Sequence, residues 1–253
     1  MPLKQIPIIL KNNFRLLIIF SILHIAAISA SGDGYRIFTD TQNRTITAKP
    51  INVIGKQFRI KKDDGSEYTI NKEMLVERDQ KYLESWALNF LAKEDRLLEI
   101  EVKRGKRKVD ETKKELTTTS GRILEDALLV ETFDGYYTLK LINRTELELN
   151  NLRVEYRLFS EQDELAAKRR KDIKLLRKNG SKKIDFLPAM ESVEFDSEPI
   201  QLVETKLLKG SWAKGGARDQ DAKLAGIWVK IYNQDQELIS YSLPNQLSSN
   251  EDW

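Results

Sequence analysis

The sequence has 253 residues, with 42 Lys and Arg, 39 Asp and Glu, one histidine and no cysteine. The histidine, His24, lies in an apolar N-terminal stretch that is expected to be removed. Ser–His relays, thiolate nucleophiles and His- or Cys-ligated metal sites are therefore excluded from the mature chain. Carboxylate chemistry and oxygen-ligated Ca²⁺ or Mg²⁺ remain open, and the length allows one or two domains without disulfides.

Residues 1–30 have the pattern of a secretory signal peptide. Lys4, Lys11 and Arg15 are followed by a nearly continuous apolar run over 16–28 and by small residues. This order of charged start, short apolar run and small-residue exit is typical of an export signal. We expect cleavage near Ala30 and a periplasmic or extracellular protein. A retained membrane anchor is the alternative, although the run is shorter than the roughly 20 residues that span a bilayer.

Removal of this segment changes the charge balance. The three basic residues of the signal are lost, which leaves 39 basic residues against 39 acidic ones and a formal net charge of zero. Proteins that grip phosphates usually carry a basic excess, because neutralising phosphate drives that binding. The sequence therefore predicts no nucleic-acid partner.

Residues 34–92 are predicted to form a compact unit of short strands followed by a helix. Strands are expected over 36–39, 45–54, 57–62 and 66–70, and Asp63–Gly65 is a strong signal for a tight hairpin turn. A helix is expected after Asn71, a plausible N-cap. Its apolar residues recur at helical spacing, which is typical of a helix docked on a core: Leu75, Tyr82, Leu83, Trp86 and Phe90.

An ordered set of residues in this unit resembles the SLA homology domain, a small SH3-like domain. The set is Arg36-x-Phe38-Thr39, Ile46-x-Ala48, Phe58-x-Ile60, Asp64-Gly65, Tyr68-x-Ile70, Leu75, Asp79 and Tyr82. Phe38 replaces the usual Trp, and Asn43 replaces a common Gly. The resemblance covers about a quarter of the chain and implies an SH3-like barrel that binds peptides. The candidate binding residues in this unit are Phe38, Tyr68, Tyr82 and Trp86.

Residues 93–119 are predicted to be a linker or an extra strand. Residues 97–103 alternate like a strand, and Arg104-Gly105-Lys106 is expected to turn the chain. The basic cluster over 103–108 is followed at once by Asp110 and Glu111, so a solvated hairpin tip or linker is favoured over a nucleic-acid contact.

Residues 120–245 are predicted to form an antiparallel β-sandwich of the immunoglobulin or fibronectin kind. Alternating strands are expected around 137–141, 152–158, 193–195 and 199–206, with a final hairpin of 226–232 and 237–243. This part resembles the sandwich that accompanies SH3-like units in secreted bacterial proteins. Residues 246–253 are expected to be a flexible tail.

The stretch 166–183 contains nine basic residues and one acidic residue. We predict a solvated, partly helical connection between strands, with Leu165, Ile173 and Leu176 on its apolar face and Gly180 as the helix stop. The alternative is an electrostatic contact with an anionic membrane surface or an acidic partner. That contact would use Lys168, Arg169, Arg170 and Lys171.

A Gly-rich loop around Trp212 is the last candidate site. Asp219 and Asp221 lack the spacing of a calcium loop, so we expect neither metal nor cofactor. Trp212 offers a stacking platform for a sugar or a peptide, or else packs against the sandwich. The overall prediction is a mainly β, exported, non-catalytic binding or scaffold protein of the bacterial cell envelope. A glycan-binding or carboxylate-dependent carbohydrate-processing protein is the alternative.

Overall fold

The computed structural model describes residues 34–163, 173–211, 216–247 and 253. The predicted signal peptide therefore lies outside the described residues. The fold is mainly β with antiparallel sheets, which confirms the predicted fold class at that level. Within the described part of the chain, no helix is both long and apolar enough to cross a membrane.

The N-terminal sheet consists of β1 (Arg36–Thr39), β2 (Thr45–Ile54), β3 (Gln57–Lys62) and β4 (Glu67–Asn71), paired antiparallel in that order. The predicted turn is present. Gly65 has φ of 87° and its N–H donates to the Lys62 carbonyl, a backbone conformation that glycine adopts without strain. Phe38, Phe58 and Ile60 form the core of this sheet and are fully buried.

A short 3₁₀ helix, η1 (Lys72–Met74), precedes the main helix, α1 (Glu77–Lys93). The expectation of Asn71 as the N-cap of one continuous helix is wrong. The side chain of Asn71 makes no capping hydrogen bond, and α1 begins only after Val76. The predicted core face is confirmed at Leu83, which is fully buried.

The next two strands form a long hairpin, β5 (Leu98–Thr117) and β6 (Ile123–Asn143). The turn expected at Arg104-Gly105-Lys106 is wrong, because this segment runs through the middle of β5. Gly105 pairs with Tyr136 of β6, and the Tyr136 ring lies over the space that a Cβ at Gly105 would occupy. Glycine here admits a cross-strand aromatic ring instead of turning the chain.

The strand β7 (Leu149–Gln162) pairs with β8 (Lys174–Leu187), which corrects the helical expectation for 173–180. Gly180 is not a helix stop. It pairs with Tyr156, whose ring covers it from the neighbouring strand. The partner of β8 is the preceding strand β7, and the local helical spacing of Ile173 and Leu176 carried no information about this pairing.

The remaining strands are β9 (Ser192–Asp196), β10 (Ile200–Leu207), β11 (Asp219–Gln220), β12 (Ala222–Asn233) and β13 (Gln236–Leu243). Two further sheets result. The arm sheet has the order β11-β10-β6-β5, with β9 also paired to β6, and the C-terminal sheet has the order β13-β12-β7-β8.

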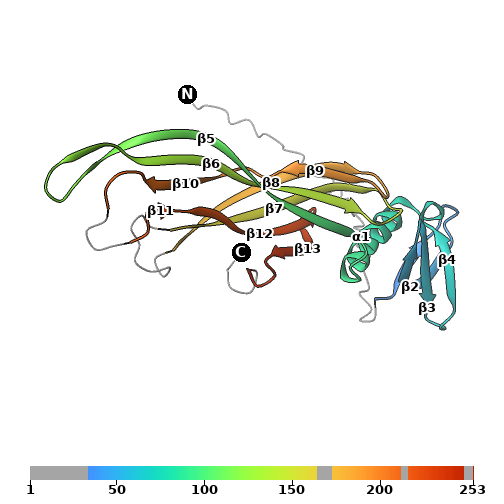
Figure 1. Cartoon of the computed structure of the whole chain (residues 1–253). Coiled ribbons are helices and arrows are strands. Elements are labelled where there is room, and N and C mark those ends of the chain that lie inside the picture. Colours follow the sequence, from blue (N-terminus) through green and yellow to red (C-terminus); the bar gives the residue numbers. More distant parts are fainter. Residues whose placement is uncertain (1–33, 164–172, 212–215, 248–252) are drawn as a thin grey trace, which may run out of the picture.

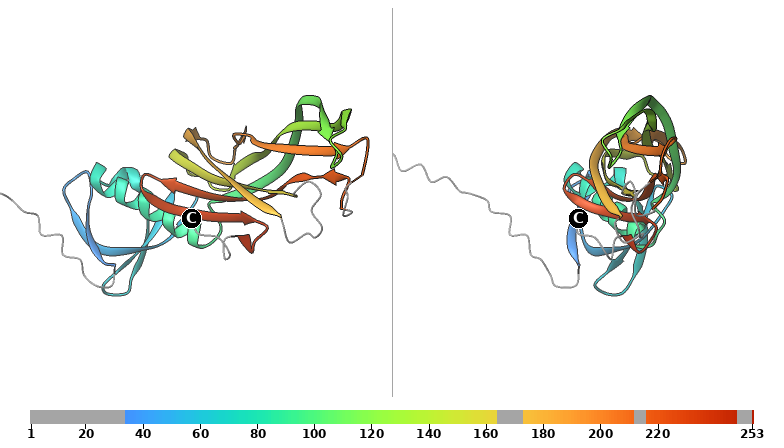
Figure 2. Two further views of the ribbon diagram at one scale, coloured as in Figure 1. Left: turned by 90° about the vertical axis from the view of Figure 1, so that its left-hand side faces the viewer. Right: turned by 60° about the vertical axis from the view of Figure 1, so that its left-hand side comes forward.

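The arm sheet and the C-terminal sheet pack face to face through β6 and β10 on one side and β7 and β12 on the other. Their core is continuous with that of the N-terminal sheet, through Leu91 of α1 and through Leu97 and Leu98 before and within β5. Figure 1 and Figure 2 show an elongated molecule, with the N-terminal sheet and α1 at one end and the tip of the β5–β6 hairpin at the other.

Candidate functional site

Two of the predicted binding residues belong to one structural cluster. Phe38 is fully buried, and its ring centroid lies 5.9 Å from that of Tyr82. The Arg36 guanidinium lies 3.8 Å above the Tyr82 ring and donates to the buried carboxylate of Asp79 at 2.6 Å. The Thr39 N–H donates to the same carboxylate at 2.7 Å. These contacts fasten α1 to β1, and Phe38 offers no surface to a ligand.

The other predicted aromatic residues are dispersed. Trp86 stacks on Phe90 along α1 with ring centroids 4.9 Å apart, and both pack against the core. Tyr68 is exposed on β4, 6.0 Å from the Lys62 ammonium group. Among the described residues, no ring contact joins Tyr68 to Phe38, Tyr82 or Trp86. The four residues therefore do not form one aromatic groove.

The remaining predicted sites cannot be placed. Trp212 and the basic residues Lys168, Arg169, Arg170 and Lys171 lie outside the described residues. The stacking platform and the electrostatic contact stay predictions.

A cleft at the junction of the N-terminal sheet and the other two sheets is the strongest candidate site. It has a volume of about 440 Å³ and we call it the junction cleft. Its walls come from Lys56 before β3, from η1, from the middle of α1, from residues 146–148 before β7 and 150–151 within it, and from the turn between β12 and β13. Leu88 of α1 and Leu147 supply its apolar surface.

The wall formed by β7 and the β12–β13 turn is held by specific contacts. The Asn233 side-chain amide donates to the Asn150 carbonyl at 2.8 Å. Gln234, in the β12–β13 turn, has φ of 54°, the left-handed conformation that tight turns require. On the opposite wall, Lys72 and Glu84 form an ion pair of 2.5 Å that links η1 to α1.

Charge in the junction cleft is unevenly paired. Glu73, Glu146 and Glu148 line it, are exposed, and make no ion pair or hydrogen bond with another side chain in the part of the chain that the structure describes. The Glu146 carboxylate lies across the turn at Gly55, where an added Cβ would be 2.7 Å from its Oε2 atom. This close approach brings the carboxylate of one unit onto the backbone of the other.

The loop between β6 and β7, which contains Glu146 and Leu147, also lines a second cleft of about 410 Å³. Glu146 and Leu147 line both, and the second cleft also includes Leu91, Arg96 and Met190. The loop therefore presents one side chain pair to two concave surfaces at the junction.

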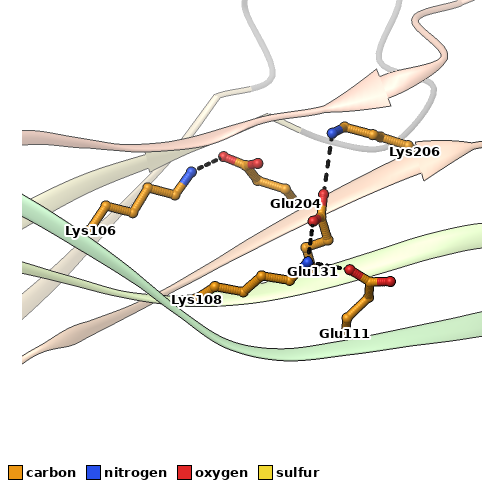
Figure 3. A network of polar contacts seen from close by, with 6 residues as sticks. All are labelled: Lys106, Lys108, Glu111, Glu131, Glu204 and Lys206. Carbon is orange, nitrogen blue, oxygen red and sulfur yellow. Dashed lines mark hydrogen bonds and ion pairs between the residues drawn. The ribbon is translucent and has the colours of Figure 1, made fainter.

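A polar network lies on the arm sheet, far from the junction (Figure 3). Glu131 accepts from Lys108 at 2.7 Å and from Lys206 at 3.2 Å, and its side chain is 13% exposed. Lys106 pairs with Glu204, and Lys108 also pairs with Glu111. The hydrogen bond from Lys108 holds the pKa of Glu131 below its ordinary value, with Lys206 acting in the same direction.

The carboxyl groups with resolved shifts do not suggest a general acid. Hydrogen bonds from lysines lower the pKa of Asp64, Glu77 and Glu131, through Lys62, Lys81 and Lys108 respectively. A general acid at neutral pH needs a raised pKa instead. Within the described ranges, no group of three or more His, Cys, Asp or Glu side chains is arranged to hold a metal ion.

Comparison with protein-family models and with curated proteins gave no match for the chain. The junction cleft was also missed by sequence reasoning. Asn233–Gln236 was predicted as a hairpin turn, but nothing in the sequence places this turn beside α1 and the residues before β7.

Proposed function

We propose that the chain is an exported, non-catalytic protein of the bacterial cell envelope that binds a peptide segment of a partner protein in the junction cleft. The observation that carries the proposal is the cleft itself. Its volume of about 440 Å³ is within the usual range of binding pockets, and its walls come from both parts of the molecule.

The chemistry of the junction cleft suits an extended peptide with one apolar and one basic side chain. Leu88 and Leu147 provide an apolar surface for the first. The carboxylates of Glu146 and Glu148 attract the second. Amide side chains at the rim, such as that of Asn151, are suited to pair with the N–H and C=O groups of a peptide backbone.

The export and fold proposals rest on other features. The N-terminal charge and apolar pattern supports export. The four-stranded N-terminal sheet with α1 is compatible with an SH3-like domain of the SLA homology kind, for which peptide binding is the expected activity. The two facing sheets are compatible with a β-sandwich of immunoglobulin or fibronectin type.

The proposal is tested by selecting binders from a random heptapeptide library on the protein without residues 1–30, followed by fluorescence anisotropy with the selected peptide. Ser85→Trp fills the cleft from the exposed face of α1 and should weaken binding at least tenfold. Glu148→Lys should weaken a basic peptide up to about fivefold, as expected for an exposed ion pair.

The matched control is Lys93→Trp, because this residue is exposed on the same helix and does not line the cleft. It should leave affinity unchanged. Failure to select any peptide, or equal loss with Ser85→Trp and Lys93→Trp, would contradict the proposal.

A further inference from the structure

The outer face of the C-terminal sheet carries a second cluster of aromatic and cationic side chains, away from the junction cleft. Trp228 of β12 lies opposite Arg157 of β7 on one side and Ser242 of β13 on the other. Its indole N–H donates to the Ser240 hydroxyl at 2.9 Å. Two residues further along β12, Lys230 projects on the same face because strand side chains alternate.

Trp253 is seated on this cluster. Its ring meets Trp228 edge-on, with centroids 4.9 Å apart and an interplanar angle of 76°. The Arg157 guanidinium lies 5.2 Å from the Trp253 ring centroid, and the Lys230 ammonium lies 4.9 Å from it. Trp228 is only 7% exposed, although it stands on the outer face of a sheet.

This geometry is that of a receptor for an aromatic side chain. Edge-to-face contact is a preferred arrangement of two aromatic rings, and cations bind the faces of indoles. Lys230 also lies 5.4 Å from the Trp228 ring, so one ammonium contacts both indoles. The occupant is itself 37% exposed, whereas the ring beneath it is almost completely covered. We therefore regard the side chains of β7 and β12 as the binding site and Trp253 as the side chain bound in it.

We propose that Trp228, Arg157 and Lys230 form an acceptor site for a tryptophan side chain, which Trp253 fills within the chain and a tryptophan of a partner polypeptide fills when it binds. The proposal does not depend on the junction cleft.

The surroundings leave room for the residues that flank an incoming tryptophan. A cleft of about 340 Å³ adjoins the site and is lined by Trp253 together with Asn179 and Ser181 of β8. The amide and hydroxyl groups of these two side chains can hydrogen-bond to a peptide backbone.

The test uses the pentapeptide GSWSG and the control peptide GSASG, titrated into the ¹⁵N-labelled protein without residues 1–30. The reporter is the indole N–H resonance of Trp228, assigned by its loss in Trp228→Phe. In Trp253→Ala the site is vacant, so GSWSG should shift this resonance and bind at least tenfold more tightly than it binds the unsubstituted protein. The tenfold difference follows because the seated Trp253 competes within the chain.

Two further variants distinguish a receptor from a merely structural contact. Lys230→Met in the Trp253→Ala background removes one cation and should weaken GSWSG severalfold. Trp228→Ala in that background should abolish binding, which is followed through the backbone amide resonances of the labelled protein because the Trp228 indole is absent. Ser66→Ala, on the N-terminal sheet, is the matched control and should change nothing. Equal affinity of GSWSG for the protein with and without Trp253, equal binding of GSASG, or retained binding without Trp228 would each overturn the proposal.

Discussion

The two halves of β6 differ in what covers the same face of the strand. Near the junction, Tyr137, Leu139 and Leu141 alternate toward the C-terminal sheet and are fully buried. Further out, Phe133 and Glu131 continue the same alternation, since β6 pairs with β9 and β10 without a register shift in these segments. There the face carries the Lys–Glu network of Figure 3 instead of an apolar core.

The difference shows that the type of side chain on a strand face, apolar or charged, depends on whether another sheet packs against that face. Where the C-terminal sheet covers β6, apolar side chains gain by leaving water. Beyond the edge of the C-terminal sheet, the face of β6 is partly exposed to solvent. There the ion pairs of Glu131 with Lys108 and Lys206 link β6 to β5 and β10. Phe133 marks the transition, with the Lys106 ammonium 3.9 Å above its ring.

The largest expected effect is in the covered half. Leu139→Ala should lower the free energy of unfolding by about 3 kcal/mol, because it removes buried methyl groups and leaves a cavity between two sheets. Urea denaturation followed by circular dichroism measures the change. A loss below about 1 kcal/mol would mean that the two sheets do not pack tightly at this position.

A loss of stability of intermediate size is expected when one of the two glycines under tyrosine rings is replaced by alanine, and a smaller loss is expected for the other. An added Cβ would approach the ring within 2.4 Å at both Gly180 and Gly105. Tyr156, over Gly180, is only 3% exposed and accepts a hydrogen bond from the Glu198 N–H at 2.9 Å, so its ring cannot move aside. Gly180→Ala should therefore cost about 2 kcal/mol, as expected for overpacking.

Gly105→Ala is the matched comparison, because Tyr136 is only half-buried and can swing toward solvent. Its cost in the same urea experiment should stay below about 1 kcal/mol. Equal costs for the two substitutions would show that exposure of the ring does not decide the tolerance.

These glycines also show where sequence reasoning succeeded and failed. The hairpin at Asp63–Gly65 and the buried face of α1 were predictable, because the residues that decide them are close together in the chain. The signals at Gly105 and Gly180 were misinterpreted as a turn and a helix stop. Each glycine is required because it pairs with a tyrosine more than twenty residues away, and the residues next to the glycine in the sequence do not indicate that pairing.

The junction cleft was beyond prediction for the same reason. Its walls bring together Lys56, Leu88, Leu147 and Gln234 from four separated parts of the chain. The individual turns were partly foreseeable, as at Asn233–Gln236, but their convergence follows from how the sheets pack. Phe38 was named as a candidate binding residue, whereas its position on β1 directs it into the core.

The smallest expected effect concerns the uncovered half of β6. Glu131→Gln removes the charge that Lys108 and Lys206 share. Because these partners lower the pKa of Glu131 in the folded protein, its contribution to stability is present above the unfolded pKa of about 4.3 and is lost as the pH falls through the folded value. At pH 7 the variant should melt lower by no more than about 4 °C, and near pH 2 the difference should vanish.

Arg107→Gln provides the control, since Arg107 pairs with Asp134 at 3.0 Å but is 71% exposed. Water screens this pair, so its loss should shift the melting temperature by less than about 1 °C at pH 7. Addition of 1 M NaCl should reduce the effect of Glu131→Gln, because salt screens partly exposed charges. A shift for Glu131→Gln that is as large at pH 2 as at pH 7 would show that packing of the side chain, and not its charge, stabilises the uncovered half.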